Sequence, residues 1–396
     1  MNSASNQFVD VVAAGHLCLD IIPALPEPAA GRPLIEPGRL TRIGPATLAL
    51  GGSVANTGLA LHRLGANTQL AARLGDDYLG RLVLELLRDH QGVRTERITC
   101  AAGEATSYSL VISPPGVDRS FLHCSGANDA FTASDLAEVG ECRILHFGYP
   151  PLMPGVLADG GAGLAKVFTE VQNAGGLVSL DMAAPDAERG LSSAEWRRWL
   201  ARVLPHVDLF LPSFDEVLQM LDPPLHAKLS AAAPENPARA ADLSGLHRFA
   251  SELLTLGPRI VVLKLGDQGL YLRSNADVES LGERRHWRHH DWSSWQQTAL
   301  YSPCLATEVV GTTGAGDCTI AGLLMSLLQG LTCEAALRHA VAVGAWSVRS
   351  LAAIDSVPAW SEVRASLATP WELRPTKMST AGWRFDGAAQ LYRAGE

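Results

Sequence analysis

The residues best suited to chemistry in this sequence lie in the stretch GTTGAGD, residues 311–317. Small residues let a ligand approach the backbone closely, and the stretch ends in a single carboxylate, that of Asp317. A nucleotide-binding P-loop is also rich in glycine, but it ends in Lys followed by Ser or Thr. Here Asp317 and Cys318 occupy those two places. Because a carboxylate has the wrong charge to clamp a phosphate, Asp317 is better suited to accept a proton.

This stretch is predicted to lead into a helix. Residues 306–310, ATEVV, have a strand-like pattern, and the segment DCTIAGLLMSLLQG has apolar residues at helical spacing. Gly314, Ala315 and Gly316 would then lie at a helix N-terminus, where free N–H groups and the helix dipole attract anions. A transferring phosphoryl group carries such a charge, and Asp317 would take the proton of an acceptor alcohol. The alternative is an Asp that only favours a helix start.

A second candidate group lies in LGGSVANTGLALHRLGA, residues 50–66. Gly51 and Gly52 permit a backbone turn close to a ligand, and the Asn56 side chain can both donate and accept hydrogen bonds. Asp20 ends the run GHLCLD just past the first predicted strand, at the carboxyl edge of the sheet. A carboxylate beside Asn56 would suit the hydroxyls of a polyol. The alternatives are a capped helix of any function and an Asp in an ordinary turn.

Short apolar runs alternate with amphipathic segments, which predicts an α/β fold with a mostly parallel sheet covered by helices on both faces. The runs span residues 8–15, 68–75, 143–148, 177–183, 208–212 and 259–266. Such sheets bind ligands at the carboxyl ends of their strands. The Pro- and Gly-rich segment 23–50 and the alternating segment 104–125 do not fit, and together they predict a small projecting sheet. That sheet would be either a flap over a pocket or a decorative hairpin.

Composition indicates a globular protein. The chain has 396 residues, 47% hydrophobic and 18% charged. A net charge of −9 argues against a nucleic-acid partner. No apolar run reaches the roughly 18 residues of a membrane span, and the start MNSASNQF does not resemble a signal peptide. Seven cysteines without a C-x-x-C pair favour reduced thiols and a cytoplasmic location.

Three further segments stand apart from the predicted core. Residues 222–242, rich in Ala and Pro, and 274–303, with HWRHHDWSSW, look like insertions, and the second is expected to be a surface loop rather than a zinc site. The tail, residues 371–396, is expected to pack back on a single α/β domain of residues 1–370. The segment GYPPLMP, residues 148–154, lies where the wall of an acceptor pocket is expected.

These motifs together resemble the ribokinase-like family of carbohydrate kinases, also called the PfkB family. GGSVANTGLALHRLG is similar to its first signature, and GTTGAGD to the second, D-T-x-G-A-G-D. RLGDDYLG, GAND, PSFDE and KLGDQG follow in the expected order, so the similarity runs from about residue 8 to residue 358. The resemblance implies a three-layer α/β sandwich with a small β lid, formed by about 23–50 and 104–125. It also implies transfer of the γ-phosphoryl group of ATP to a hydroxymethyl group.

The resemblance assigns roles at matching positions. Asp317 would be the catalytic base, and an anion hole would be formed by Gly314, Ala315 and Gly316. The sugar would be held by Asp20, Gly51, Gly52 and Asn56. Glu216, which matches the acid of the family's N-x-x-E, would organise Mg²⁺ through water. The ATP side would be lined by Lys264, Gly266, Gly269 and Thr312.

Two positions depart from the family pattern. Gly311 replaces the first Asp of the second signature, which helps some members to bind a monovalent cation, so potassium dependence is open. Ser213 replaces the Asn of N-x-x-E, which weakens the expected contact near the triphosphate. We therefore expect an active sugar kinase, and the alternatives are a nucleoside kinase and a non-catalytic sugar or nucleoside sensor. In this family an exposed lid sheet can serve as a dimer interface, so the resemblance also allows a homodimer through the lid.

Overall fold

The computed structural model describes residues 8–27, 37–115, 120–137, 139–186, 190–352 and 354–395. Within them, a large sheet has the strand order β14-β15-β13-β12-β11-β10-β9-β8-β1-β4-β5. Seven neighbouring strands are parallel: β5 (Arg94–Ala101), β4 (Thr68–Gly75), β1 (Val9–Gly15), β8 (Cys142–Gly148), β9 (Leu177–Leu180), β10 (Leu209–Phe210) and β11 (Ile260–Lys264). An antiparallel edge follows: β12 (Leu270–Ser274), β13 (Ala299–Ser302), β15 (Leu391–Ala394) and β14 (Trp383–Asp386). The predicted mostly parallel sheet is confirmed.

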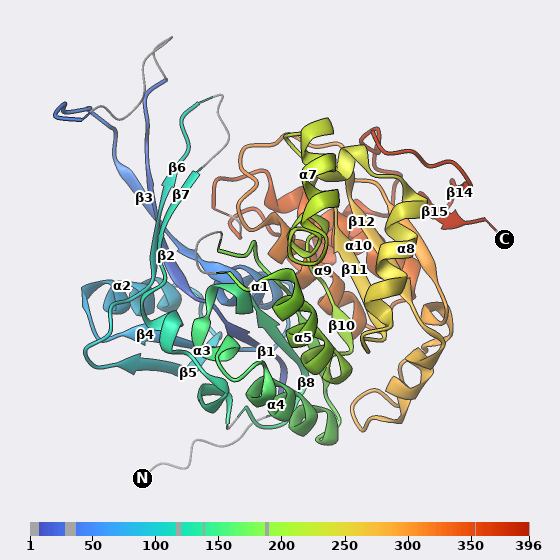
Figure 1. Ribbon diagram of the computed structural model, residues 1–396, viewed down its shortest axis with the longest axis horizontal. Coiled ribbons are helices and arrows are strands. Elements are labelled where there is room, and N and C mark those ends of the chain that lie inside the picture. The colour runs from blue at the N-terminus through green and yellow to red at the C-terminus, as the bar shows by residue number, and fades with distance from the viewer. Residues whose placement is uncertain are drawn as a thin grey trace.

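Helices cover both faces of this sheet (Figure 1). One core cluster joins the sheet to α1 (Gly52–Arg63), α2 (Tyr78–Arg88), α9 (Ala315–Leu328), α10 (Cys333–Ser347) and α11 (Trp360–Ser366). The other joins it to α3 (Pro154–Leu157), α4 (Ala162–Asn173), α5 (Ser193–Val203), α6 (Phe214–Leu221) and α8 (Leu243–Leu254). Strand β1 shows why there are two clusters, because Val11 and Ala13 point to the first and Val12 and Ala14 to the second. Buried on both faces, such a strand is apolar throughout.

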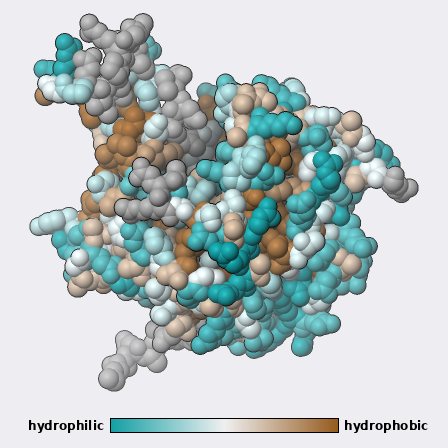
Figure 2. Space-filling view, in the orientation of Figure 1, coloured by the Kyte–Doolittle hydropathy of each residue, from teal (hydrophilic) through white to brown (hydrophobic). Residues whose placement is uncertain are grey.

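A small sheet projects from one end of the large one (Figure 1). It consists of β3 (Ala46–Gly51), β2 (Cys18–Pro23), β6 (Tyr108–Ile112) and β7 (Ser120–Cys124) in that order. Strand β2 pairs antiparallel with β3 and parallel with β6. Leu48, Phe121 and Leu122 are exposed on this sheet, and Figure 2 shows an apolar area there. The sheet includes residues 18–22, which the sequence analysis did not assign to it.

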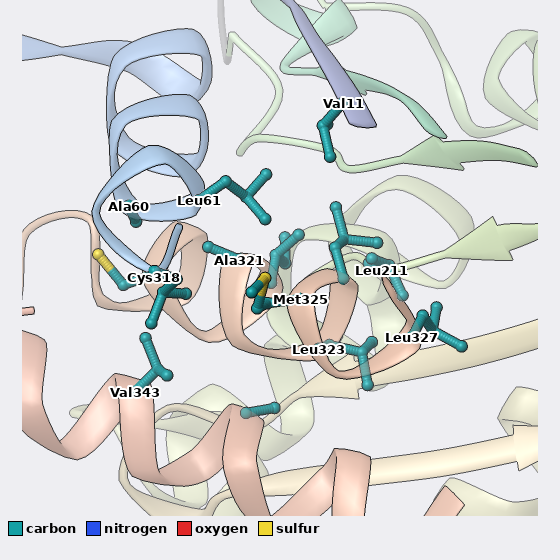
Figure 3. Packing of buried hydrophobic residues seen from close by; sticks show 14 of the residues in the cluster. Val11, Ala60, Leu61, Leu211, Cys318, Ala321, Leu323, Met325, Leu327 and Val343 are labelled. Atoms are coloured by element: carbon teal, nitrogen blue, oxygen red, sulfur yellow. The ribbon is translucent and has the colours of Figure 1, made fainter. Parts of the chain in front are cut away.

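Helix α9 packs tightly between its neighbours. Figure 3 shows Ala60 and Leu61 of α1 beside Ala321 of α9, with Val343 of α10 nearby. At Gly322 of α9, an added Cβ would lie only 2.9 Å from Cβ of Val343, so this glycine permits the close approach of α10. The packing fixes α9 in the core, and its first turn therefore has a defined place beside α1.

Two sequence predictions are wrong. Residues 306–310, expected to be a strand, form none, and Leu305 makes only an isolated bridge to Leu373. The segment 274–303, expected to be a surface loop, buries Trp287, Trp292 and Trp295 and contributes β13. These indole rings lie in the core cluster on the α10 face, and burying such large apolar groups outweighs the polar residues around them.

The predicted insertion at 222–242 begins with α7 (Pro223–Ala232), and the tail supplies β14 and β15. Short 3₁₀ helices connect other elements: Gly126–Ala130, Ala133–Leu136, Pro150–Leu152, Leu204–His206, Pro237–Ala240, Gly266–Gln268, Ala276–Glu283 and Ser293–Trp295. No helix in the described part of the chain is both long enough and apolar enough to span a membrane.

Candidate active site

The first turn of α9 forms the centre of the site. Gly314 caps the helix with a φ of 69°, in the left-handed region that favours glycine, and no side chain caps the helix there. The first residues of the helix, Ala315 and Gly316, have almost no side chain, so an anion has access to the backbone amides. An uncapped N-terminus of this kind attracts negative charge. The predicted anion hole therefore has suitable geometry.

Asp317 follows in the same turn and is 2% exposed. Its Oδ2 accepts a hydrogen bond from Nδ2 of Asn56 at 2.9 Å, so the two sequence motifs meet at this carboxylate. The hydroxyl of Tyr149 donates to Oδ1 at 2.9 Å and to Oδ2 at 2.8 Å. Burial raises the pKa of Asp317, while the positive charge of Lys264 and these hydrogen bonds oppose the rise. The pKa of this carboxylate is thus set by burial on one side and by its charged and hydrogen-bonding neighbours on the other.

Lys264 lies directly behind the anion hole. A Cβ added to Gly316 would be 3.3 Å from Cδ of Lys264. The lysine Nζ donates to Oδ1 of Asp181 at 2.6 Å, so its ammonium group is already paired with a protein carboxylate.

The sequence analysis did not name Asp181. It is fully buried, and its Oδ2 has no hydrogen-bond partner among the described residues. Burial raises the pKa of Asp181 to about 8, although Lys264 lowers it.

A cavity of about 560 Å³ opens from the anion hole. Seven of the predicted residues line it: Glu216, Lys264, Gly266, Gly269, Thr312, Ala315 and Gly316. The segment 222–242 contributes Asn236 and Arg239 to the wall, and the tail contributes Arg374. The volume is in the range of small-molecule sites. The residues predicted for ATP and the metal, and two of the three predicted for the anion, therefore share one cavity.

Glu216 has a structural contact as well as a place in this cavity. Its Oε2 accepts a hydrogen bond from the backbone N–H of Ser213 at 3.0 Å, which closes the start of α6. Burial raises the pKa of Glu216, and the charge of Lys264 opposes this rise. Ser213, the departure from N-x-x-E, thus supports Glu216 through its backbone N–H, and a hydrogen bond from its side chain also lowers the pKa of Glu216.

The predicted acceptor residues lie on the other side of Asp317. Asp20 is 7% exposed and lies within β2 of the small sheet, so it is not in an ordinary turn, which was the alternative that the sequence left open. A Cβ at Gly51 would come within 2.4 Å of its Oδ2. At Gly52, with a φ of 84°, a Cβ would be 2.5 Å from the carbonyl oxygen of His16. Gly52 is therefore required sterically, whereas a side chain at Gly51 would displace the carboxyl group of Asp20. Burial raises the pKa of Asp20.

Two histidines complete this side and were missed from the sequence. His16 follows β1, His123 lies on β7, and their Nε2 atoms are 3.3 Å apart. Burial, together with His123, lowers the pKa of His16 to about 3, so its ring is neutral. The His16 ring centroid is 6.0 Å from that of Tyr149. The only sequence signal was the position of each residue at a strand end or on the predicted flap.

A second cavity, of about 920 Å³, adjoins the acceptor side. It is lined by His123 of the small sheet and by Pro151 and Leu152 of the predicted pocket wall. Asp129 and the buried Trp196 also line it. The segment GYPPLMP therefore does border a cavity, in addition to placing Tyr149 on Asp317.

Known proteins are similar to this chain over most of its length. Residues 9–360 match the family described as pfkB family carbohydrate kinase. An uncharacterized sugar kinase of Archaeoglobus fulgidus is 25% identical over 303 residues, covering 76% of this chain and 98% of that protein. A nucleoside kinase of Methanothermobacter thermautotrophicus is 24% identical over 370 residues, covering 92% of this chain and 98% of that protein.

The fold is also found among solved structures. The structure of Arabidopsis thaliana ribokinase complexed with ribose and ATP matches with a TM-score of 0.66 and 21% identity, over 92% of this chain and 100% of that one. This likeness confirms the predicted ribokinase-like fold. With the family match over nearly the whole chain, it shows that the chain belongs to the pfkB family of carbohydrate kinases.

Proposed function

We propose that this carbohydrate kinase transfers the γ-phosphoryl group of ATP to a hydroxymethyl group of a sugar, with Asp317 as the base. One observation carries the proposal. A buried carboxylate stands at an uncapped helix N-terminus, between a nucleotide-sized cavity and a cluster of polar acceptor residues. In this arrangement a base and an anion hole face the same reacting group.

The step balances with these residues. The hydroxyl oxygen of the sugar forms a bond to the γ-phosphorus, and the bond from that phosphorus to the bridging oxygen of ADP breaks. The electron pair leaves with ADP, and the hydroxyl proton passes to Asp317. The backbone amides of Gly314, Ala315 and Gly316 hold the negative charge of the transferring group.

Magnesium fits the oxygen donors at the nucleotide cavity. Glu216 lines the cavity, and its negative charge helps to raise the pKa of Asp181, whose Oδ2 lacks a partner among the described residues. Within the described ranges, no three His, Cys, Asp or Glu side chains are grouped to bind a metal alone. Mg²⁺ is commonly held by one or two carboxylates with waters and substrate phosphates, so Glu216 would hold it through water. When bound, the ion would neutralise phosphate charge.

The acceptor would be recognised by Asp20 and Asn56, whose polar atoms suit sugar hydroxyls. Gly51 and Gly52 would let it approach the backbone. A second candidate is a nucleoside, because the adjoining cavity of about 920 Å³ has room for more than a monosaccharide. The nucleoside kinase among the relatives is consistent with this alternative.

An acceptor panel tests the proposal. The protein is incubated with ATP, Mg²⁺ and individual pentoses, hexoses, sugar acids and nucleosides, and ADP release is measured together with the phosphorylated product. We expect one class to give stoichiometric ADP and phosphorylated acceptor. Binding of an acceptor without any ADP release would instead identify a non-catalytic sensor. A repeat with K⁺ replaced by a bulky organic cation decides the dependence on a monovalent ion.

Gly51→Ala is expected to weaken acceptor binding selectively. The new Cβ would overlap the carboxyl group of Asp20, and this side chain must move away. The displaced Asp20 carboxylate would lose its hydrogen bonds to the hydroxyls of the sugar. KM for the sugar should therefore rise about 10-fold or more, while KM for ATP stays constant. Gly387→Ala is the matched control, since nothing lies within 4 Å of its added Cβ. Equal changes in both KM values would contradict the assignment of Asp20.

A further inference from the structure

Tyr149 has an unusual backbone conformation for its type. It follows β8 with φ 67° and ψ 39°, in the left-handed region that residues with a side chain rarely adopt. The next residue is Pro150, and a residue before proline normally favours an extended backbone. Such conformations persist where the surrounding structure holds them, and they cluster at functional sites.

The conformation brings the phenol onto Asp317. The hydroxyl lies 2.9 Å from Oδ1 and 2.8 Å from Oδ2, so it bridges the two carboxylate oxygens. Burial and the negative charge of Asp317 raise the pKa of Tyr149 well above its usual range. The phenol is therefore neutral and donates its proton into this bond.

The hydrogen bonds from Tyr149 limit the directions from which the hydroxyl of an acceptor can approach Asp317. An ionised carboxylate offers about four lone-pair sites. Asn56 occupies a site on Oδ2, and the bridging hydroxyl of Tyr149 faces both oxygens. Little more than one approach remains for the hydroxyl of an acceptor. A carboxylate held from two sides also cannot rotate freely, so its open lone pair keeps one direction.

We propose that Tyr149 is a positioning residue whose hydroxyl fixes the orientation of Asp317 and leaves room there for a single acceptor hydroxyl. This inference rests on the proposed role of Asp317 as the base. It assigns a function to the left-handed backbone at the start of GYPPLMP, and it gives the chain a second support for the base beside Asn56.

The electrostatics of Asp317 make the role measurable. Several ionisable or polar groups act on it from the elements packed around it: Lys264 of β11, Asp181 after β9, Glu216 of α6, Asn56 of α1 and Tyr149 after β8. Burial raises the pKa of Asp317, and the hydrogen bond from Tyr149 opposes this rise. Loss of that bond should raise the pKa further, so the base is protonated over a wider range of acidic pH.

Tyr149→Phe tests the inference because it removes only the hydroxyl. We expect kcat/KM for the acceptor to fall roughly 10-fold to 100-fold near neutral pH, in line with hydrogen bonds to charged groups. The acid limb of its pH profile should move to higher pH, while KM for ATP is unchanged. The control is Tyr271→Phe, a buried tyrosine whose hydroxyl lies 3.0 Å from Nδ1 of His247. A Tyr149→Phe enzyme with the parental rate and pH profile would overturn the proposal.

A double-mutant cycle separates this inference from the proposed function. Tyr149→Phe, Asp317→Asn and the double variant are unfolded with urea at acidic and at weakly alkaline pH. We expect a coupling free energy that is larger at alkaline pH, where Asp317 is ionised. If the parent phosphorylates no acceptor, the proposed function fails, and the cycle alone shows whether Tyr149 holds Asp317. If the parent is active and the two substitutions are additive at both pH values, only the Tyr149 proposal fails.

Discussion

Asp317→Asn is expected to reduce kcat by about 10² to 10⁴ while the affinity for ATP changes little. The amide has nearly the same shape as the carboxylate, so α9 and its uncapped N-terminus should be preserved. It cannot take the proton of the acceptor hydroxyl, however. Because burial raises the pKa of the parental Asp317, the parent itself should lose activity as the pH falls through that raised value.

The measurement is steady-state turnover with the acceptor found in the panel, together with binding of ATP in the absence of acceptor. Asp76→Asn is the control, because the Asp76 side chain is 62% exposed and pairs with Arg81 at the surface. A variant at Asp317 that turns over at the parental rate would show that another group accepts the proton. A variant that no longer binds ATP would indicate a structural role.

The sequence contained the central pair of the site but not its full surroundings. Gly314 to Asp317 and Asn56 were recognisable because glycine, small residues and a first-turn polar group are local signals of a helix N-terminus. Nδ2 of Asn56 lies 2.9 Å from Oδ2 of Asp317 because α1 packs against α9. The sequence marks the ends of both helices but not the distance between them.

Asp181 and Tyr149 illustrate what the sequence could not show. Asp181 follows an apolar strand, as many turn residues do, and only the fold buries it against Lys264. Tyr149 reaches Asp317 through a positive φ that its sequence neighbours disfavour. His16 and His123 are 107 residues apart, and the pairing of the small sheet brings them together. These contacts are tertiary, so no periodicity in the chain reports them.

In the fold, too, local patterns could be predicted from the sequence, whereas features that depend on tertiary packing could not. Continuous apolar runs predicted six of the seven parallel strands, because both faces of such strands are buried. They missed β5, most of whose residues are exposed or half-buried. Strand β2 escaped prediction because it begins three residues after β1 ends, so residues 15–20 were interpreted as the segment that follows the first strand. The segment around Trp287, Trp292 and Trp295 was misjudged because Arg and His separate the indoles and conceal an apolar face.

Lys264→Met is expected to impair both stability and catalysis. Lys264 pairs with Asp181 at 2.6 Å and lowers the pKa values of Asp181, Glu216 and Asp317. Removing one partner of a buried ion pair typically costs about 3 to 5 kcal/mol, because the other charge remains unpaired. At neutral pH the carboxylates should respond by taking up protons. The base would then be lost, and we expect kcat/KM to fall roughly 10-fold to 100-fold with partial recovery at alkaline pH.

The loss of stability in Lys264→Met should depend on pH, and its direction follows from the pKa values. The pKa of Asp181 is already raised to about 8 by burial, and without Lys264 it should rise further, whereas an unfolded chain ionises Asp near pH 4 (about 3.9). A carboxyl group whose pKa is higher in the folded state contributes stability below its unfolded pKa and loses it as the pH rises. The variant should therefore unfold in urea almost like the parent at low pH and fall increasingly behind it toward alkaline pH. Lys166→Met, at a lysine side chain that is 80% exposed, should show no such trend. A stability difference that stays constant across this range would mean that Lys264 does not neutralise the buried carboxylates.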